Sequence, residues 1–122
     1  MKENEPSGKP YDLGDRTFAF AQAVRVLFKR LTHTVANLED GRQVIRASGS
    51  VGANYIEAGE ALSKKDFLLR IKICRKEAKE AHYFLRLLDT GNVPQLERDR
   101  AALVQEAQEL TNIFGAIVRK SE

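Results

Sequence analysis

Cationic side chains gather between residues 64 and 86, where their type and spacing suit the binding of phosphate groups. This segment carries eight lysines and arginines against three acids. Lysine and arginine are the residues that neutralise the backbone of nucleic acids. We expect the phosphate contacts to come from Lys65, Lys72, Arg75, Lys76 and Lys79. The alternative is an ordinary solvated helix face, on which Lys76 pairs with Glu80 four residues later.

Two acids interrupt an apolar stripe of the same segment. Glu77 and Glu80 share that stripe with Leu69, Ile73, Phe84 and Leu87. Buried carboxylates have to be paired with cations or hydrogen-bonded. We therefore expect a buried polar network that fixes the register of helices or subunits. Its expected members are Arg46, Asn54, Glu57, Glu77 and Glu80, with Arg75 as a further available cation.

A carboxylate metal site is the sharper alternative for these acids. Di-iron bundles use Glu-x-x-His motifs on two helices, and this sequence contains none. His82 follows Glu80 by two residues, and His33 stands alone in another segment. Cys74 falls in an apolar stripe, which favours a buried small side chain over a nucleophile. We expect no catalytic residue, no metal and no cofactor, and a protein that is not an enzyme.

Three glycines, Gly49, Gly52 and Gly59, keep helical spacing in the segment before the basic one. A phosphate-binding loop would need a Gly-Lys-Ser/Thr ending, which is missing. The RNA-clamping Gly-x-x-Gly of KH domains belongs to a mixed fold with strands, and no strand pattern is visible here. Small residues on one helix stripe let a neighbouring helix come close. We interpret the three glycines as a close-packing stripe.

The elements that carry these residues follow from apolar spacings of three and four. Four helices are predicted, at about residues 15–39, 42–62, 64–89 and 94–119. Gly41 is expected to end the first helix. Ser63 and Asp66 form a capping-box-like start for the third helix, and Pro94 suits the first turn of the fourth. Residues 1–11 are expected to be a flexible segment and residues 12–122 one domain, an all-α antiparallel up-down four-helix bundle.

The totals agree with a single small domain. The chain has 122 residues, a formal net charge of +3 and one cysteine. A lone cysteine gives no disulfide framework, which fits a reducing compartment. The N-terminus lacks an apolar signal-peptide core, and no stretch reaches the ~18–20 apolar residues of a membrane span. We expect a cytoplasmic protein with no membrane contact.

The longest distinctive stretch is RASGSVGANYIEAGEALSKKDFLLRIKICRKEAKEAHYFLRLLD, residues 46–89. It resembles the core of the four helix bundle proteins of the 23S ribosomal RNA intervening-sequence family. YDLGDRTFAFA at residues 11–21 and LEDGRQVIR at residues 38–46 resemble that family as well. Phe84 stands where relatives commonly have Trp, and Thr32 where many have Pro.

The resemblance implies assembly into a ring-shaped homopentamer. A distant branch of that family serves as accessory protein of diversity-generating retroelements, where a basic ring partners a reverse transcriptase and nucleic acid. Two hypotheses follow. The first is a non-catalytic oligomer that associates with RNA or DNA through the basic helix. The second is a protein-interaction adaptor or scaffold ring whose positive charge is incidental.

Overall fold

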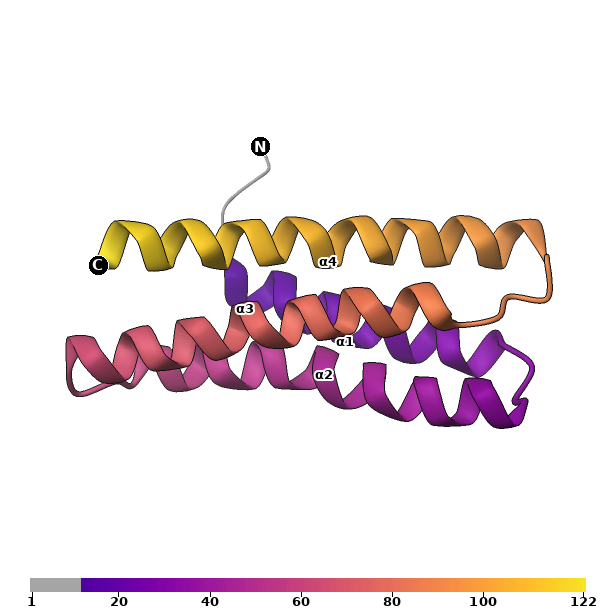
Figure 1. The fold of residues 1–122 in the computed structure, drawn as a ribbon, viewed down its shortest axis with the longest axis horizontal. Coiled ribbons are helices and arrows are strands. Elements are labelled where there is room, and N and C mark those ends of the chain that lie inside the picture. The colour runs from indigo at the N-terminus through magenta and orange to yellow at the C-terminus, as the bar shows by residue number, and fades with distance from the viewer. Residues whose placement is uncertain (1–11) are drawn as a thin grey trace.

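The computed structural model describes residues 12–122, and these residues form four helices with no strand among them. The helices are α1 (Leu13–Arg30), α2 (Val35–Gly59), α3 (Lys64–Leu87) and α4 (Pro94–Ser121). They lie side by side, and each helix runs back along the one before it (Figure 1). The all-α prediction is confirmed. The predicted flexible segment, residues 1–11, lies outside the described residues.

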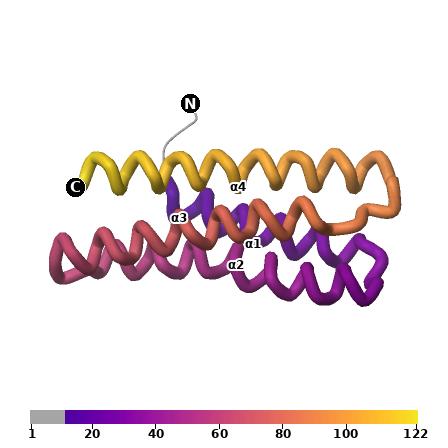
Figure 2. The backbone as a smooth tube through the Cα atoms, in the orientation of Figure 1, coloured from indigo at the N-terminus to yellow at the C-terminus, as the bar shows by residue number. Residues whose placement is uncertain are grey.

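Each helix packs against two others, in the order α1, α2, α3, α4 and back to α1. The contact between α2 and α3 is the most extensive and that between α1 and α4 the least. The backbone trace shows why, because α4 continues well past the stretch that α1 accompanies (Figure 2). The side chains between the helices form one apolar core, whose largest fully buried members are Phe114, Leu27, Ile71, Leu85, Leu88 and Leu110.

Side-chain caps define three of the helix starts. Asp12, Thr34 and Ser63 each accept a hydrogen bond from the backbone N–H three residues later. Such bonds satisfy amide groups that a helix leaves free in its first turn. The fourth helix begins instead with Pro94, which has no N–H to satisfy. The predicted starts at Ser63 and Pro94 are thus confirmed.

The predicted end of the first helix is wrong. α1 ends at Arg30, and a short connection leads to α2 at Val35. Gly41 does not stop a helix but lies inside the second turn of α2. The prediction failed because Leu31, Val35 and Leu38 keep helical spacing across the break. In the structure Leu31 is buried, whereas Val35 and Leu38 are exposed.

The remaining helix bounds differ less from the prediction. α2 begins at Val35 instead of residue 42 and ends at Gly59 instead of residue 62. α3 starts at the predicted residue and ends at Leu87, two residues early. α4 also starts as predicted and reaches Ser121, two residues further than expected.

One buried side-chain amide links the connection between α1 and α2 to the connection between α3 and α4. Asn37 is 1% exposed, and its Nδ2 donates to the carbonyl oxygens of Thr32 at 2.8 Å and Asp89 at 2.9 Å. The backbone N–H of Asp89 donates in turn to Asn37 Oδ1 at 2.9 Å. Asn37 therefore ties the start of α2 to the connection between α3 and α4.

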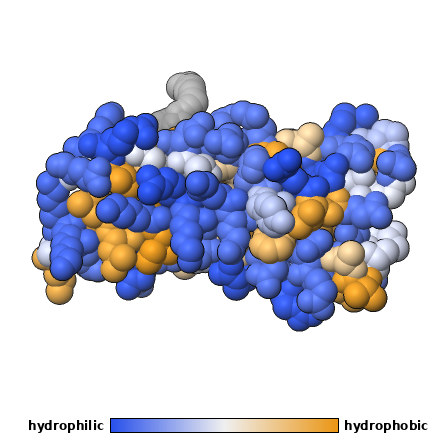
Figure 3. Space-filling model, in the orientation of Figure 1, coloured by the Kyte–Doolittle hydropathy of each residue, from blue (hydrophilic) through white to orange (hydrophobic). Residues whose placement is uncertain are grey.

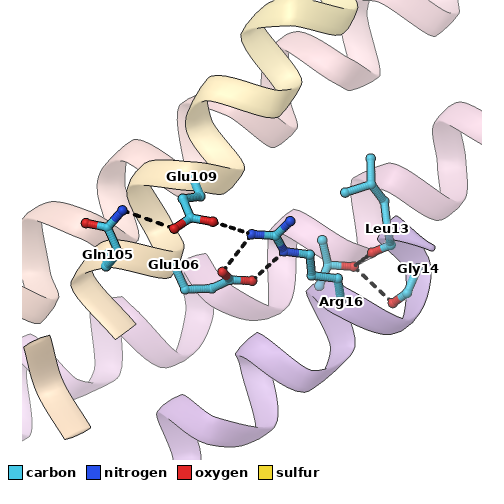
Figure 4. A network of polar contacts seen from close by, with 7 residues as sticks. Leu13, Gly14, Arg16, Gln105, Glu106 and Glu109 are labelled. Atoms are coloured by element: carbon cyan, nitrogen blue, oxygen red, sulfur yellow. Dashed lines mark hydrogen bonds and ion pairs between the residues drawn. The ribbon is translucent and has the colours of Figure 1, made fainter. Parts of the chain in front are cut away.

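Ion pairs fasten both ends of α1 to α4. Arg16, near the start of α1, forms a forked pair with Glu106 at 2.7 Å and reaches Glu109 at 2.9 Å (Figure 4). Its hydrogen bond to Glu106 raises the pKa of the Arg16 guanidinium. At the other end, Arg30 contacts Asp99 at 2.6 Å, which lowers the pKa of that carboxyl.

Candidate nucleic-acid interface

The exposed side of α3 carries a row of mostly cationic residues. Residues 65, 69, 72, 76, 79, 83 and 86 follow one another at helical spacing, and all seven are exposed. Five of them are basic, Leu69 and Tyr83 are the other two, and none is acidic. We call this row the basic stripe, and its cations are Lys65, Lys72, Lys76, Lys79 and Arg86.

The cations of the basic stripe are largely unpaired. Lys72 approaches Glu122 at 3.7 Å, and both side chains are about half exposed. Within residues 12–122, no carboxylate pairs with Lys65, Lys76 or Lys79. The alternative pair of Lys76 with Glu80 does not form, because Glu80 turns to Arg46 of α2. The stripe is therefore available to external anions.

The sequence-predicted candidates divide into two groups. Lys65, Lys72, Lys76 and Lys79 share the basic stripe. Arg75 is half-buried and lies at the seam between α3 and α4, where its Cδ packs near Gly115. Arg86 was not among the candidates, although its spacing from Lys79 already placed it on the same face.

Two of the three acids of α3, Glu77 and Glu80, face α2 instead of the basic stripe. Arg46 Nη1 lies 3.2 Å from Glu77 Oε1, and Arg46 Nη2 also donates to Glu80. Glu77 is 6% exposed. Its Oε1 is close to Arg46 but off the hydrogen-bonding direction, and it accepts no hydrogen bond within the described chain. The structure thus places three of the five predicted network residues together, in an ion pair across α2 and α3.

The other two predicted network residues lie elsewhere. Asn54 accepts a hydrogen bond from Arg70 Nη1 at 3.1 Å and donates to Ser50, which makes a separate link between α2 and α3. Glu57 is exposed, so its expected place in a buried network is wrong. The spacing of Asn54 and Glu57 did place them on neighbouring turns, but only Asn54 faces α3.

The glycines of α2 meet very different surroundings. A Cβ added at Gly52 would lie 3.1 Å from the hydroxyl of buried Thr17 of α1, so close packing holds there. At Gly49 the nearest atom is a guanidinium nitrogen of Arg25, and at Gly59 nothing lies within 4 Å. Close packing at Gly59 is therefore wrong. The tightest contact is at Gly41, where a Cβ would lie 2.1 Å from Phe28.

An apolar groove of about 700 Å³ runs between α1 and α2 on the outside of the bundle. Gly49, Gly52, Phe18 and Ile56 are among the residues that line it. Both of these large side chains are about two-thirds exposed. Large apolar residues that share an exposed groove are typical of a surface that binds another protein.

The environment of Cys74 is unfavourable for a thiol nucleophile. Cys74 is buried, its Sγ lies 3.4 Å from the carbonyl oxygen of Val51, and burial raises the pKa of its thiol to about 12. A thiol with such a pKa is protonated at neutral pH and is a poor nucleophile. No group of three or more His, Cys, Asp or Glu in residues 12–122 could hold a metal ion. None of the four helices is long and apolar enough to cross a membrane.

Comparison with known proteins agrees with this architecture. The structure resembles the crystal structure of a protein of unknown function from the S23 ribosomal protein family of Bacteroides thetaiotaomicron VPI-5482. The TM-score is 0.75 at 27% identity, over 88% of this chain and 98% of the other. No protein with a curated description matches the chain. The family model of the 23S rRNA-intervening sequence protein matches residues 11–116. The chain therefore belongs to the 23S rRNA-intervening sequence protein family.

Proposed function

We propose that this protein is a non-catalytic, cytoplasmic homo-oligomer that binds the backbone of RNA or DNA through the basic stripe of α3. Each protomer is an antiparallel up-down bundle, and the protomers form a ring, a pentamer in the arrangement that the family resemblance implies. The observation that carries the proposal is the row of five exposed cations with no acid among them.

The dimensions of the basic stripe suit a nucleic-acid backbone. From Lys65 to Arg86 the helix rises about 30 Å at 1.5 Å per residue. That length is close to one turn of a duplex, about 34 Å. Lysines on flexible stems contact phosphates as point charges and need no particular base sequence. The proposed binding is therefore independent of sequence and sensitive to salt.

Assembly would strengthen this field. The groove between α1 and α2, which Phe18 and Ile56 line, supports self-association, since burying it would remove exposed apolar surface from water. A contact between two different faces of the protomer closes into a ring when its rotation allows. Each added copy brings another basic stripe, so the ring attracts a polyanion more strongly than one chain does.

Filter binding of a single-stranded RNA and of a DNA duplex across a salt series tests the proposal. Lys76→Glu combined with Lys79→Glu should weaken binding and lower the slope of log affinity against log salt by about 1.8 on a duplex, for two lost phosphate contacts. Lys29→Glu combined with Arg42→Glu makes the same charge change on α1 and α2, and should lower the slope far less. Absence of binding at low salt, or equal loss in both variants, would refute the proposal.

A second candidate function is a protein-interaction adaptor. Near the start of α3, Leu68 and Leu69 line a hollow of about 550 Å³ together with Lys64, Lys65 and Lys72. Figure 3 shows apolar atoms over this first half of α3, among hydrophilic ones. Such a mixed surface also suits a polypeptide, for example a reverse transcriptase. A stoichiometric protein that is recovered from native lysate after nuclease treatment, and lost with Leu69→Asp, would favour this function.

A further inference from the structure

Side-chain atoms of two arginines from neighbouring helices lie beside the same glycine, Gly115. Gly115 is buried in α4 against α3. The position that its Cβ would take lies 3.7 Å from Arg75 Cδ of α3 and 3.4 Å from Arg119 Nη1 of α4. The two arginine atoms are therefore no further apart than the sum of these distances. A Cβ at position 115 would make ordinary van der Waals contact with both atoms.

Neither arginine has an acidic partner. Within residues 12–122, no carboxylate forms an ion pair with Arg75 or Arg119. In α4 no acid occurs between Glu109 and Glu122. Glu109 pairs with Arg16 on the side of α1, and Glu122 approaches Lys72. The acids of α3 in this region face Arg46 of α2.

The surroundings of the two arginines add positive charge. Lys72 and Lys79 lie about one turn before and after Arg75 along α3. On α4, the residues one turn before Gly115 are Thr111 and Asn112, which carry hydrogen-bonding groups and no charge. Neighbouring like charges repel one another, and an anion between them reduces that repulsion. Glu122, which approaches Lys72, offsets part of this charge, but neither Arg75 nor Arg119 has a carboxylate partner among the described residues.

We propose that Arg75 and Arg119 form a phosphate clamp at the seam of α3 and α4, beside Gly115. Guanidinium groups match phosphate oxygens with two parallel hydrogen bonds each, which an ammonium group does not reproduce. The clamp takes a phosphate group, either a phosphodiester of the nucleic acid or free inorganic phosphate. If the phosphate is a phosphodiester of a nucleic acid, the clamp rests on the nucleic-acid binding proposed above.

Charge-preserving variants separate the clamp from general attraction by charge. Arg75→Lys combined with Arg119→Lys keeps every charge but loses the forked hydrogen bonds. Arg42→Lys combined with Arg98→Lys is the matched control, because both arginines are exposed away from the seam. Binding of a 20-nucleotide single-stranded RNA is measured across a salt series for each. In parallel, inorganic phosphate is titrated into the wild-type protein while the arginine Nε–H resonances are followed by NMR.

The clamp predicts that the seam variant binds the RNA about tenfold more weakly than the control at fixed salt, because its forked bonds are lost. Arg75→Gln with Arg119→Gln should also lower the salt slope by about 1.4, for two contacts on a single strand. Phosphate should shift the resonances of Arg75 and Arg119 before those of Arg42 and Arg98.

The outcomes distinguish the clamp from the proposed function. If the seam variant binds RNA as tightly as the control while Lys76→Glu with Lys79→Glu abolishes binding, the clamp is refuted and the function stands. If phosphate shifts the two seam resonances but no RNA binds at low salt, the function is refuted and the clamp stands as a site for free phosphate. If phosphate shifts all arginine resonances alike, and Arg75→Lys with Arg119→Lys binds RNA as tightly as its control, the clamp is refuted.

Discussion

The contact between Gly41 and Phe28 gives the sharpest test of the packing, because the predicted effect changes sign with one neighbouring side chain. An alanine Cβ at position 41 would lie 2.1 Å from Phe28 Cε1 and 2.5 Å from Cδ1. Real Cβ contacts are not this short, so the ring has to move. Phe28 stacks on His33 at 4.5 Å between ring centroids, which restrains such a movement.

Two terms set the size of the Gly41→Ala effect. Overfilling a packed site costs about 1–3 kcal/mol, and a contact this short belongs at the upper end. Replacing an interior helical glycine by alanine contributes about 1 kcal/mol in the opposite direction. The free energy of unfolding should therefore fall by about 1–2 kcal/mol. In a Phe28→Ala background the clash is absent. Gly41→Ala should then raise the free energy of unfolding by about 1 kcal/mol.

Urea unfolding followed by circular dichroism measures all four proteins of this cycle at one protein concentration, since self-association shifts apparent stability. The coupling energy between the two sites should be about 2–3 kcal/mol. If Gly41→Ala raises the free energy of unfolding by the same amount with Phe28 and with Ala at position 28, the Phe28 ring moves aside without an energetic cost. The close contact would then carry no energetic weight.

Three further predictions concern the core and its links. Gly52→Leu should lower the free energy of unfolding by about 1–3 kcal/mol by overfilling the contact with Thr17. Gly59→Ala should raise it, by less than the ~1 kcal/mol of an interior position because Gly59 is the last residue of α2, and urea unfolding of both variants would show the difference. Asn37→Ala removes three hydrogen bonds and should lower the free energy of unfolding by about 3 kcal/mol in the same urea experiment. A loss below about 0.5 kcal/mol, the level of a neutral surface change, would contradict the role of Asn37. The raised pKa of the Cys74 thiol, about 12, predicts that its contribution to stability is complete below pH ~9 and is lost as pH rises toward 12. The free energy of unfolding of the wild type relative to Cys74→Ala should fall by about 1.4 kcal/mol between pH ~8 and pH ~10, and a constant difference would refute the assigned pKa.

The sequence predicted best those features that depend on one helix alone. The start of α3 at Ser63 needs only a hydroxyl and the amide of Asp66, which it meets at 3.0 Å. The buried face of α3 follows directly from its apolar spacing, since Ile71, Cys74 and Leu85 are all fully buried. The same spacing placed the lysines of the basic stripe on the opposite side.

The break between α1 and α2 was harder to predict, because neither proline nor glycine marks it. The signal that was available is Thr34, a capping residue whose side chain accepts from the amide of Asn37 at 3.1 Å. What decides the break is long-range, namely the hydrogen bonds between Asn37 and Asp89, fifty-two residues apart in sequence. No local pattern contains that information.

The roles of the glycines depended on neighbours in the same way. Regular spacing grouped Gly52 and Gly59, yet Thr17 of α1 packs against Gly52 and nothing reaches Gly59. Gly41 looked like a helix stop, and the ring that fills the space beside it comes from Phe28 on another helix. Spacing tells which residues share a face, but the partner across that face decides whether a small residue is needed.

The attachment of α1 has a consequence for how the molecule opens. Its seam with α4 contains a hollow of about 340 Å³ beside Ala23, Val26 and Leu27, while Arg16 and Arg30 hold its two ends. These end contacts are partly exposed, so dissolved ions weaken them. The more extensive contact of α2 with α3 also contains an ion pair, that of Arg46 with Glu77 and Glu80, but its buried apolar side chains are not screened by salt. Amide hydrogen exchange should therefore be fastest in α1 and should accelerate there as the salt concentration rises. On this account α1 detaches first, while α2, α3 and α4 remain packed together.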